Sequence, residues 1–111
     1  MIQLPKPVLT YFEAENAHDL VKALACFDEN AVVFDTGEEL EMKGIAAIQK
    51  WKETVTSKYK LHIKPLDASV KGQDVEVLTE VSGDFDGSPI KFNYKFKLNN
   101  DLIVYLSSEP R

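Results

Sequence analysis

The chain has 111 residues, of which 44% are hydrophobic and 28% are charged, and its formal net charge is −5. These values are typical of one soluble globular domain, spanning residues 1–111, with enough apolar side chains for one core. The acidic balance argues against nucleic acid and anionic membrane surfaces as partners, because both require a patch of Lys and Arg.

The cysteine content and the apolar segments indicate in which cellular compartment the protein is expected. Cys26 is the only cysteine, so no internal disulfide and no cysteine metal site can form, and a reducing cytoplasm fits. The first seven residues lack the apolar segment of a signal peptide. No run of 18 apolar residues is present that could cross a membrane. We therefore expect a cytoplasmic protein that does not contact a membrane.

Two helices are expected in the first quarter of the chain. The first runs from about Val8 to Glu15, because Pro7 suits a first helical turn and the following Asn16 suits a left-handed stop. The second begins near Asp19, since the helix dipole favours an acidic residue there. Its apolar residues have the i, i+4, i+7 spacing of a core-facing helix and are Leu20, Leu24 and Phe27. Polar residues 28–30 end this helix.

The middle of the chain is expected to alternate between short strands and a third helix. Residues 31–34 form a strand, and the acidic stretch 35–42 turns and forms a second one. A helix then runs from about Ile45 to Ser57 and buries one side, made up of Ile45, Ile48, Trp51 and Val55. From Tyr59 onward apolar and polar residues alternate, which predicts sheet for the rest of the chain.

The dipeptide Asp86-Gly87 is the strongest hairpin signal in the sequence. A two-residue turn there sorts apolar from charged residues onto opposite faces of the hairpin. On the apolar face it pairs Val81 with Phe92, Thr79 with Tyr94, and Val77 with Phe96. A further turn at residues 99–101 adds a last strand, which places Val104 opposite Phe96 and Leu106 opposite Tyr94.

These elements predict an α+β fold with a curved antiparallel sheet that has one apolar face. The three helices of the N-terminal half must cover that face, because nothing else in the chain can. A strongly curved sheet wrapped around helices forms a cone, and the open end of a cone is a natural ligand pocket.

Tyr11, on the first expected helix, and Asp35, directly after the first expected strand, make the best case for chemistry. A phenol and a carboxylate brought to one apolar pocket can move a proton and stabilise the resulting enolate. Two other interpretations remain open. Asp35 can cap the bend at residues 35–37, and Tyr11 can be an aromatic side chain of the core.

A pattern of residues extends over nearly the whole chain and comprises Tyr11-Phe12, Asn16, Asp19-Leu20, Phe27 to Val32, Asp35, Gly44, Ile48, Trp51 and residues 85–89. It resembles the nuclear transport factor 2-like superfamily, in its SnoaL-like and ketosteroid-isomerase-like branch. The resemblance implies the cone-shaped nuclear transport factor 2-like (cystatin-like) fold. It is poorly specific for activity, since the superfamily hosts many functions.

The resemblance also implies roles for individual residues. In ketosteroid isomerases of this fold, a tyrosine on the first helix donates to the steroid oxyanion and an aspartate after the first strand shuttles the proton. Laid on this sequence without a gap, these positions fall on Tyr11 and Asp35. The isomerases carry a second acid at the position of Phe96, which cannot donate a hydrogen bond. Losing one oxyanion donor typically costs ~2.7–4 kcal/mol of transition-state stabilisation, so efficient steroid isomerisation is not expected.

The sequence thus predicts a small-molecule isomerase, cyclase or dehydratase acting on an apolar, carbonyl-bearing ligand. Asp35 is the expected general base and Tyr11 the expected oxyanion donor. The expected pocket lining consists of Trp51, Thr79, Phe92, Tyr94 and Phe96. No cofactor is implied, and the two histidines lack the spacing of a metal site. The alternative, which Phe96 favours, is a non-catalytic module that binds a small ligand or a protein.

The outer face of the sheet is expected to carry charged side chains together with Ile103 and Tyr105, which lie beside Lys97 and Lys95. Proteins of the superfamily that this chain resembles often dimerise through that face. The resemblance therefore implies a homodimer with a mixed polar and apolar interface.

Overall fold

The computed structural model describes residues 3–36, 39–58 and 60–111. The three helices among these residues are α1 (Lys6–Asn16), α2 (Leu20–Leu24) and α3 (Ile45–Lys58). The six strands are β1 (Phe27–Asp35), β2 (Leu40–Lys43), β3 (His62–Lys71), β4 (Asp74–Ser82), β5 (Ile90–Asn99) and β6 (Leu102–Pro110). The α+β class is as predicted. Only α1 and α2 precede the first strand, whereas α3 follows β2, so the expectation of three N-terminal helices is met in part.

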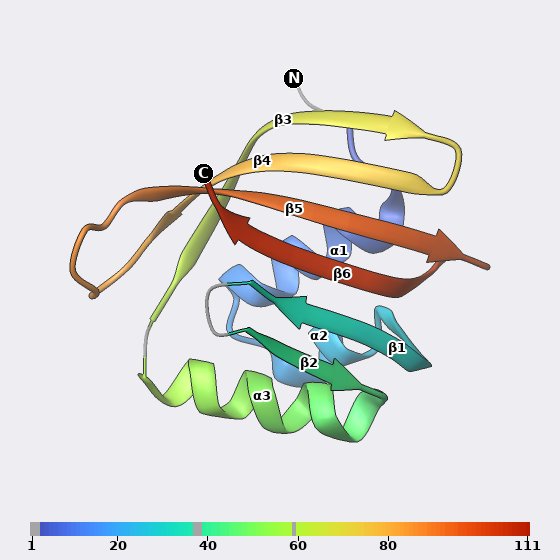
Figure 1. Ribbon diagram of the computed structural model, residues 1–111, viewed down its shortest axis with the longest axis horizontal. Helices are drawn as coiled ribbons and strands as arrows, with labels where there is room; N and C mark the ends of the chain where they lie inside the picture. Colours follow the sequence, from blue (N-terminus) through green and yellow to red (C-terminus); the bar gives the residue numbers. More distant parts are fainter. Residues whose placement is uncertain (1–2, 37–38, 59) are drawn as a thin grey trace.

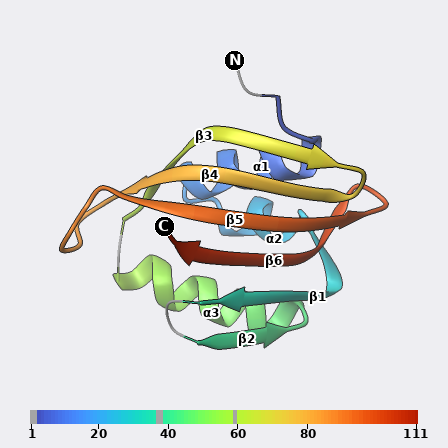
Figure 2. The same cartoon turned by 45° about the horizontal axis from the view of Figure 1, so that its top comes forward.

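The strands form one curved sheet in the order β2-β1-β6-β5-β4-β3 (Figure 1). All neighbouring strands are antiparallel except β1 and β6, which are parallel. The helices pack against one face of the sheet, with α1 against β3 and β6 and α3 against β1 and β2 (Figure 2). The apolar core therefore lies between this face and the helices.

Asn16 joins α1 to the sheet. Its side-chain amide donates to the carbonyl oxygen of Ile63 at 2.8 Å and accepts from the Ile63 N–H at 2.7 Å. The left-handed residue after α1 is His18, with φ of 56°, so the expected left-handed stop at Asn16 is wrong. The Asp19 carboxylate then accepts a hydrogen bond from the backbone N–H of Lys22 at 3.0 Å and caps α2, in line with its predicted place at a helix start.

The second helix ends earlier than its apolar spacing predicts. Phe27 begins β1 instead of closing α2, because it pairs with Ile103 in the parallel strand β6. The backbone N–H of Ile103 also donates to the Cys26 carbonyl oxygen at 2.8 Å. The first strand thus covers residues 27–35 and not only 31–34, with an irregular register between Phe27 and Val32. Pairing with a distant strand overrides a helical pattern here.

The β4–β5 hairpin has a longer loop than the predicted two-residue turn. Its register pairs Thr79 with Phe92, Val77 with Tyr94 and Val75 with Phe96, two residues away from the expected pairing. The reason is the segment 83–89, in which the Gly83 N–H donates to the Ser88 hydroxyl oxygen at 2.9 Å. Because side chains alternate along a strand, a two-residue shift keeps every side chain on its predicted face.

The β5–β6 hairpin differs from the prediction in which residues of its last strand lie on the outer face of the sheet. Asn100 and Asp101 form a two-residue turn with φ of 52° and 61°. The register then shifts between Lys97 and Leu98, so that Leu98 faces Ile103 while Phe96 faces Leu106. This extra residue in β6 turns Ile103 inward, where its exposed fraction is 0%. The expectation that Ile103 points outward is therefore wrong, and Tyr94 faces Ser108 rather than Leu106.

Some expectations fall outside the described residues. Gly37, Glu38, Tyr59 and the side chain of Val55 are among these positions. Within the described part of the chain, α3 spans Ile45–Lys58, in agreement with the predicted third helix. No helix in that part is long and apolar enough to cross a membrane.

Candidate functional site

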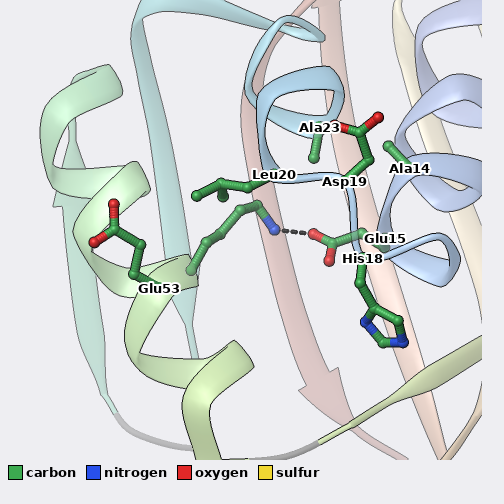
Figure 3. A pocket seen from close by; sticks show the side chains of 8 residues that line it. Ala14, Glu15, His18, Asp19, Leu20, Ala23 and Glu53 are labelled. Carbon is green, nitrogen blue, oxygen red and sulfur yellow. Dashed lines mark hydrogen bonds and ion pairs between the residues drawn. The ribbon is translucent and has the colours of Figure 1, made fainter.

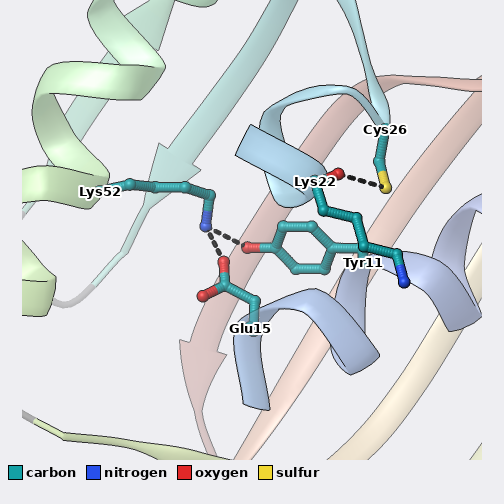
Figure 4. Close-up of polar contacts among 5 residues, drawn as sticks. All are labelled: Tyr11, Glu15, Lys22, Cys26 and Lys52. Atoms are coloured by element: carbon teal, nitrogen blue, oxygen red, sulfur yellow. Dashed lines mark hydrogen bonds and ion pairs between the residues drawn. The ribbon is translucent and has the colours of Figure 1, made fainter. Parts of the chain in front are cut away.

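A buried cation lies between α1 and α3. Lys52, on α3, is only 5% exposed. Its ammonium donates a hydrogen bond to the Tyr11 hydroxyl oxygen at 2.6 Å and forms an ion pair with the Glu15 carboxylate (Figure 4). Tyr11 and Glu15 are four residues apart on α1, so one face of that helix presents both groups to the lysine. The three side chains form a polar cluster at the edge of the core.

Two aromatic rings flank the same ammonium. The Lys52 nitrogen lies 4.5 Å from the centre of the Tyr11 ring and 5.0 Å from the centre of the Trp51 ring. Aromatic faces attract cations at these distances, most strongly when water is excluded. The Trp51 indole N–H is buried and has no hydrogen-bond partner among the described residues. The surroundings of Lys52 therefore stabilise a cation through one carboxylate and two aromatic faces.

Burial also sets the protonation of this cluster. It lowers the pKa of the Lys52 ammonium, and the Glu15 carboxylate opposes that shift. Burial, followed by the charge of Glu15, raises the pKa of the Tyr11 hydroxyl well above its ordinary value of 10.0. Tyr11 is therefore a neutral hydroxyl near pH 7, which is the form that can donate a hydrogen bond.

Asp35 ends β1, where it faces Leu40 on one side and Ser108 on the other, and it is partly buried. Burial and then the charges of Glu15 and Asp35 raise the pKa of Tyr94. Tyr94 in turn contributes to the raised pKa of Tyr11. The strand register places Asp35, Ser108 and Tyr94 side by side across β1, β6 and β5, whereas the Tyr11 hydroxyl is bonded to Lys52.

The expected lining residues take different places. Phe96 is buried and packs edge-on against Tyr11, with ring centres 6.0 Å apart. Tyr94 packs edge-on against Phe12 at 5.4 Å and is stacked on Phe96 at 6.1 Å. Phe92 is only partly buried, with its ring centre 6.5 Å from that of Tyr94. Aromatic side chains therefore fill much of the space between α1 and the sheet.

The hydroxyl of Thr79 already has a partner. Thr79 is fully buried, and its hydroxyl donates to the carbonyl oxygen of Phe92 at 3.1 Å. The Thr79 hydroxyl therefore satisfies a backbone carbonyl group of the neighbouring strand β5.

A cavity of about 290 Å³ lies between the three helices (Figure 3). Apolar side chains and charged groups both line it. The apolar residues are Ala14, Leu20 and Ala23, and the polar ones are Glu15, His18, Asp19, Lys52 and Glu53. The Lys52–Glu15 ion pair therefore belongs to the wall of this cavity and to the polar cluster with Tyr11. Among the described residues, no group of three or more His, Cys, Asp or Glu side chains is placed to hold a metal ion.

Sequence reasoning missed Lys52 and Glu15. Two signals were present, because Lys52 follows Ile48 by four residues on the buried side of α3, and Glu15 follows Tyr11 by four on α1. A lysine in an apolar stripe is usually solvated at its charged end, so the pattern alone did not indicate burial.

The sequence pattern of the SnoaL-like domain family matches residues 8–105. The chain belongs to this family. The match confirms the predicted superfamily and covers every element from α1 into β6. No curated protein matches this SnoaL-like chain.

Solved structures agree with this assignment. A proposed polyketide cyclase from Sinorhizobium meliloti, protein SMa1630, is 31% identical to this SnoaL-like chain, with a TM-score of 0.90. The similarity covers 96% of this chain and 95% of that one.

Two more distant structures share the fold. A protein from Catenulispora acidiphila with a ketosteroid isomerase-like fold, in complex with trimethylamine, is 16% identical, with a TM-score of 0.87 and coverage of 96% and 86%. TerC, co-crystallised with polyporic acid, is 11% identical, with a TM-score of 0.85 and coverage of 96% and 89%. At these identities the likeness concerns the nuclear transport factor 2-like fold of this SnoaL-like protein.

Proposed function

We propose that this SnoaL-like protein is a cofactor-independent isomerase, cyclase or dehydratase for a small, apolar, carbonyl-bearing molecule. The ligand binds at the end of the cone where Asp35, Phe92 and Tyr94 are only partly buried. Asp35 removes a proton from the carbon next to the carbonyl, and Tyr11 donates a hydrogen bond to the enolate oxygen. Trp51, Thr79, Phe92, Tyr94 and Phe96 shape the pocket.

The alignment of Asp35 with Tyr94 across neighbouring strands is the observation that carries this proposal, because the register pairs Asp35 with Ser108 of β6 and Ser108 with Tyr94 of β5. Burial, and then the charges of Glu15 and Asp35, raise the pKa of Tyr94, and burial followed by the charge of Glu15 raises the pKa of Tyr11. Burial keeps both hydroxyls protonated near pH 7, as an oxyanion donor requires. Tyr94 is therefore a second candidate donor beside Tyr11, where Phe96 has no polar atom to offer.

The names of the similar proteins support the same class of ligand. The Sinorhizobium meliloti protein is a proposed polyketide cyclase, and TerC was crystallised with polyporic acid. Polyketides carry several carbonyl groups with acidic neighbouring C–H bonds, so cyclisation begins with the proton removal assigned here to Asp35.

Deuterium exchange tests the proposed proton transfer without knowledge of the natural substrate. The probe is 2-tetralone in D₂O, and NMR follows deuterium uptake at the carbons next to the ketone. We expect the wild-type protein to accelerate the exchange and Asp35→Asn to slow it by about 10²–10⁴-fold, the usual contribution of a general base. The affinity for 2-tetralone should stay nearly unchanged in Asp35→Asn, because the amide preserves shape.

Asp28→Asn is the matched control, because Asp28 lies on the same strand and its carboxylate accepts from the Asn30 N–H at the other end of β1. It should leave the exchange rate unaltered. Equal rates for wild type and Asp35→Asn would refute the assignment of the base.

A non-catalytic ligand-binding or protein-interaction module is the second candidate. The observation that favours it is the engagement of the Tyr11 hydroxyl by Lys52 at 2.6 Å, which leaves that oxygen less available to a ligand. Binding of 2-tetralone without any accelerated exchange would support this candidate.

A further inference from the structure

The cavity between the helices brings together a buried primary amine and groups that can exchange protons with it. Lys52 lines the cavity together with Glu15, while its ammonium also bonds to the Tyr11 hydroxyl oxygen. The side chain of Lys52 is 6% exposed, and that of Glu15 is 23% exposed. Protein atoms therefore surround most of the ion pair, and a small molecule can approach it through the cavity.

We propose that Lys52 forms a Schiff base with a small aldehyde or ketone that enters the helix cavity. This activity is separate from the proton transfer proposed for Asp35, because Lys52 acts as a nucleophile, Asp35 acts as a general base, and the two residues lie at different places in the fold. It requires an aliphatic or small aromatic carbonyl compound, since the cavity of about 290 Å³ has Ala14, Leu20 and Ala23 as its apolar wall.

The atoms and protons balance within the cluster. The Lys52 ammonium gives one proton to the Glu15 carboxylate, and the resulting amine attacks the carbonyl carbon to form a C–N bond. The carbonyl oxygen then leaves as water, with protons supplied by the amine and by Glu15, and the Tyr11 hydroxyl can relay them. The sum is ammonium plus carbonyl giving iminium plus water, so no oxidant, reductant or other reactant is needed.

The residues around Lys52 favour both the attacking amine and the iminium product. The iminium is a cation like the ammonium, so the Glu15 carboxylate and the faces of Tyr11 and Trp51 can stabilise it in the same place. Burial lowers the pKa of the Lys52 ammonium, and a lysine with a lowered pKa offers more neutral amine for attack near pH 7. Glu15 supplies the acid and base function that formation of the C–N bond and loss of water require.

Reductive trapping tests the proposal on the intact protein. Wild-type protein is incubated at pH 7 with cyclohexanone and sodium cyanoborohydride, which reduces an iminium to a stable secondary amine. Peptide mass mapping then gives the rate of cyclohexyl addition at each lysine. We expect Lys52 to react faster than any exposed lysine, because burial lowers the pKa of its ammonium.

Lys50 supplies the matched control, since it lies on the same helix but is exposed. Lys50→Arg should leave the rapid addition in place, and Lys52→Arg should abolish it. Arginine keeps the positive charge beside Glu15 but cannot form an imine. The excess of the rate at Lys52 over the rate at Lys50 should persist near pH 7.

A rate at Lys52 no higher than at Lys50 in the wild-type map overturns the proposal, and this result does not depend on the folding of any variant. Asp35→Asn should retain the rapid addition at Lys52. Failure of the Asp35 experiment and failure of the trapping experiment are therefore separate results.

Discussion

At the scale of single residues, the ion pair of Lys52 and Glu15 is asymmetric. The Lys52 side chain is almost entirely enclosed, whereas the Glu15 carboxylate is 23% exposed at the cavity. A buried charge costs free energy unless it is paired and hydrogen-bonded. Loss of the partner should therefore cost more free energy when the charge left behind is that of Lys52 than when it is that of Glu15.

Replacement of Glu15 by Gln should therefore destabilise the protein strongly. We expect a loss of about 3 kcal/mol in the free energy of unfolding, because the substitution leaves the Lys52 ammonium buried without its counter-charge. Lys52→Met should cost less, since it leaves an apolar side chain in an apolar site and a carboxylate at a solvated edge. Urea unfolding followed by circular dichroism measures both values.

The exposed pair of Glu41 and Lys43 is the control for this comparison. Their charged groups are 3.4 Å apart, and their side chains are 49% and 75% exposed. Glu41→Gln should change the free energy of unfolding by less than about 1 kcal/mol. An equal loss in Glu15→Gln and Glu41→Gln would mean that the burial of Lys52 has no energetic consequence.

At the scale of the elements, β6 shows how one inserted residue decides which side chains are buried. Strict alternation would place Ile103 on the same face as Tyr105, two residues further on. The irregularity in the β5–β6 register instead places Ile103 and Leu106, three residues apart, in the core. Pairing of Phe27 with Ile103 covers that position from the other side.

Ile103→Ala should consequently behave as a core substitution. We expect a loss of 2–5 kcal/mol, the usual range for a fully buried isoleucine cut back to alanine. Tyr105→Ala should cost clearly less, because Tyr105 is only partly buried. Thermal and urea unfolding of the two variants measure the difference. Similar small losses at both positions would favour the outward orientation that alternation alone predicts.

At the scale of the whole molecule, the face of the sheet opposite the helices is the candidate interface between copies. Charged residues face each other there, with Glu76 opposite Lys95 and Glu80 opposite Lys91. Tyr105 lies opposite Lys97 and lines a shallow groove of about 240 Å³. The dimer prediction rested on Ile103 and Tyr105. Because Ile103 is buried, the prediction now depends on Tyr105.

Light scattering at micromolar concentration tests this prediction. We expect the mass of a homodimer for the wild-type protein and a shift toward monomer for Tyr105→Ser, which removes the aromatic contact. Leu9→Ser is the control, because Leu9 is exposed on α1, away from this face. A monomer peak for the wild-type protein would contradict the prediction.

Much of the architecture could be predicted from short-range patterns in the sequence. The residues that favour helix ends located α1, and apolar spacing located α3, each to within two residues at both ends. Alternation placed β4 and β5 with the correct faces although the register was off by two, since a shift of two preserves the side of every residue. The residues that resemble the superfamily also identified the SnoaL-like family.

Only the tertiary structure could decide the features that depend on distant partners. The start of β1 at Phe27 follows from its pairing with Ile103, far along the chain, and the burial of Ile103 follows from the irregular register between β5 and β6. The same holds for the candidate site, in which Tyr11 and Glu15 meet Lys52 only because α1 and α3 pack together. Sequence periodicity reports which side of an element is apolar, but the free energy of a buried charge depends on the group that faces it across the core.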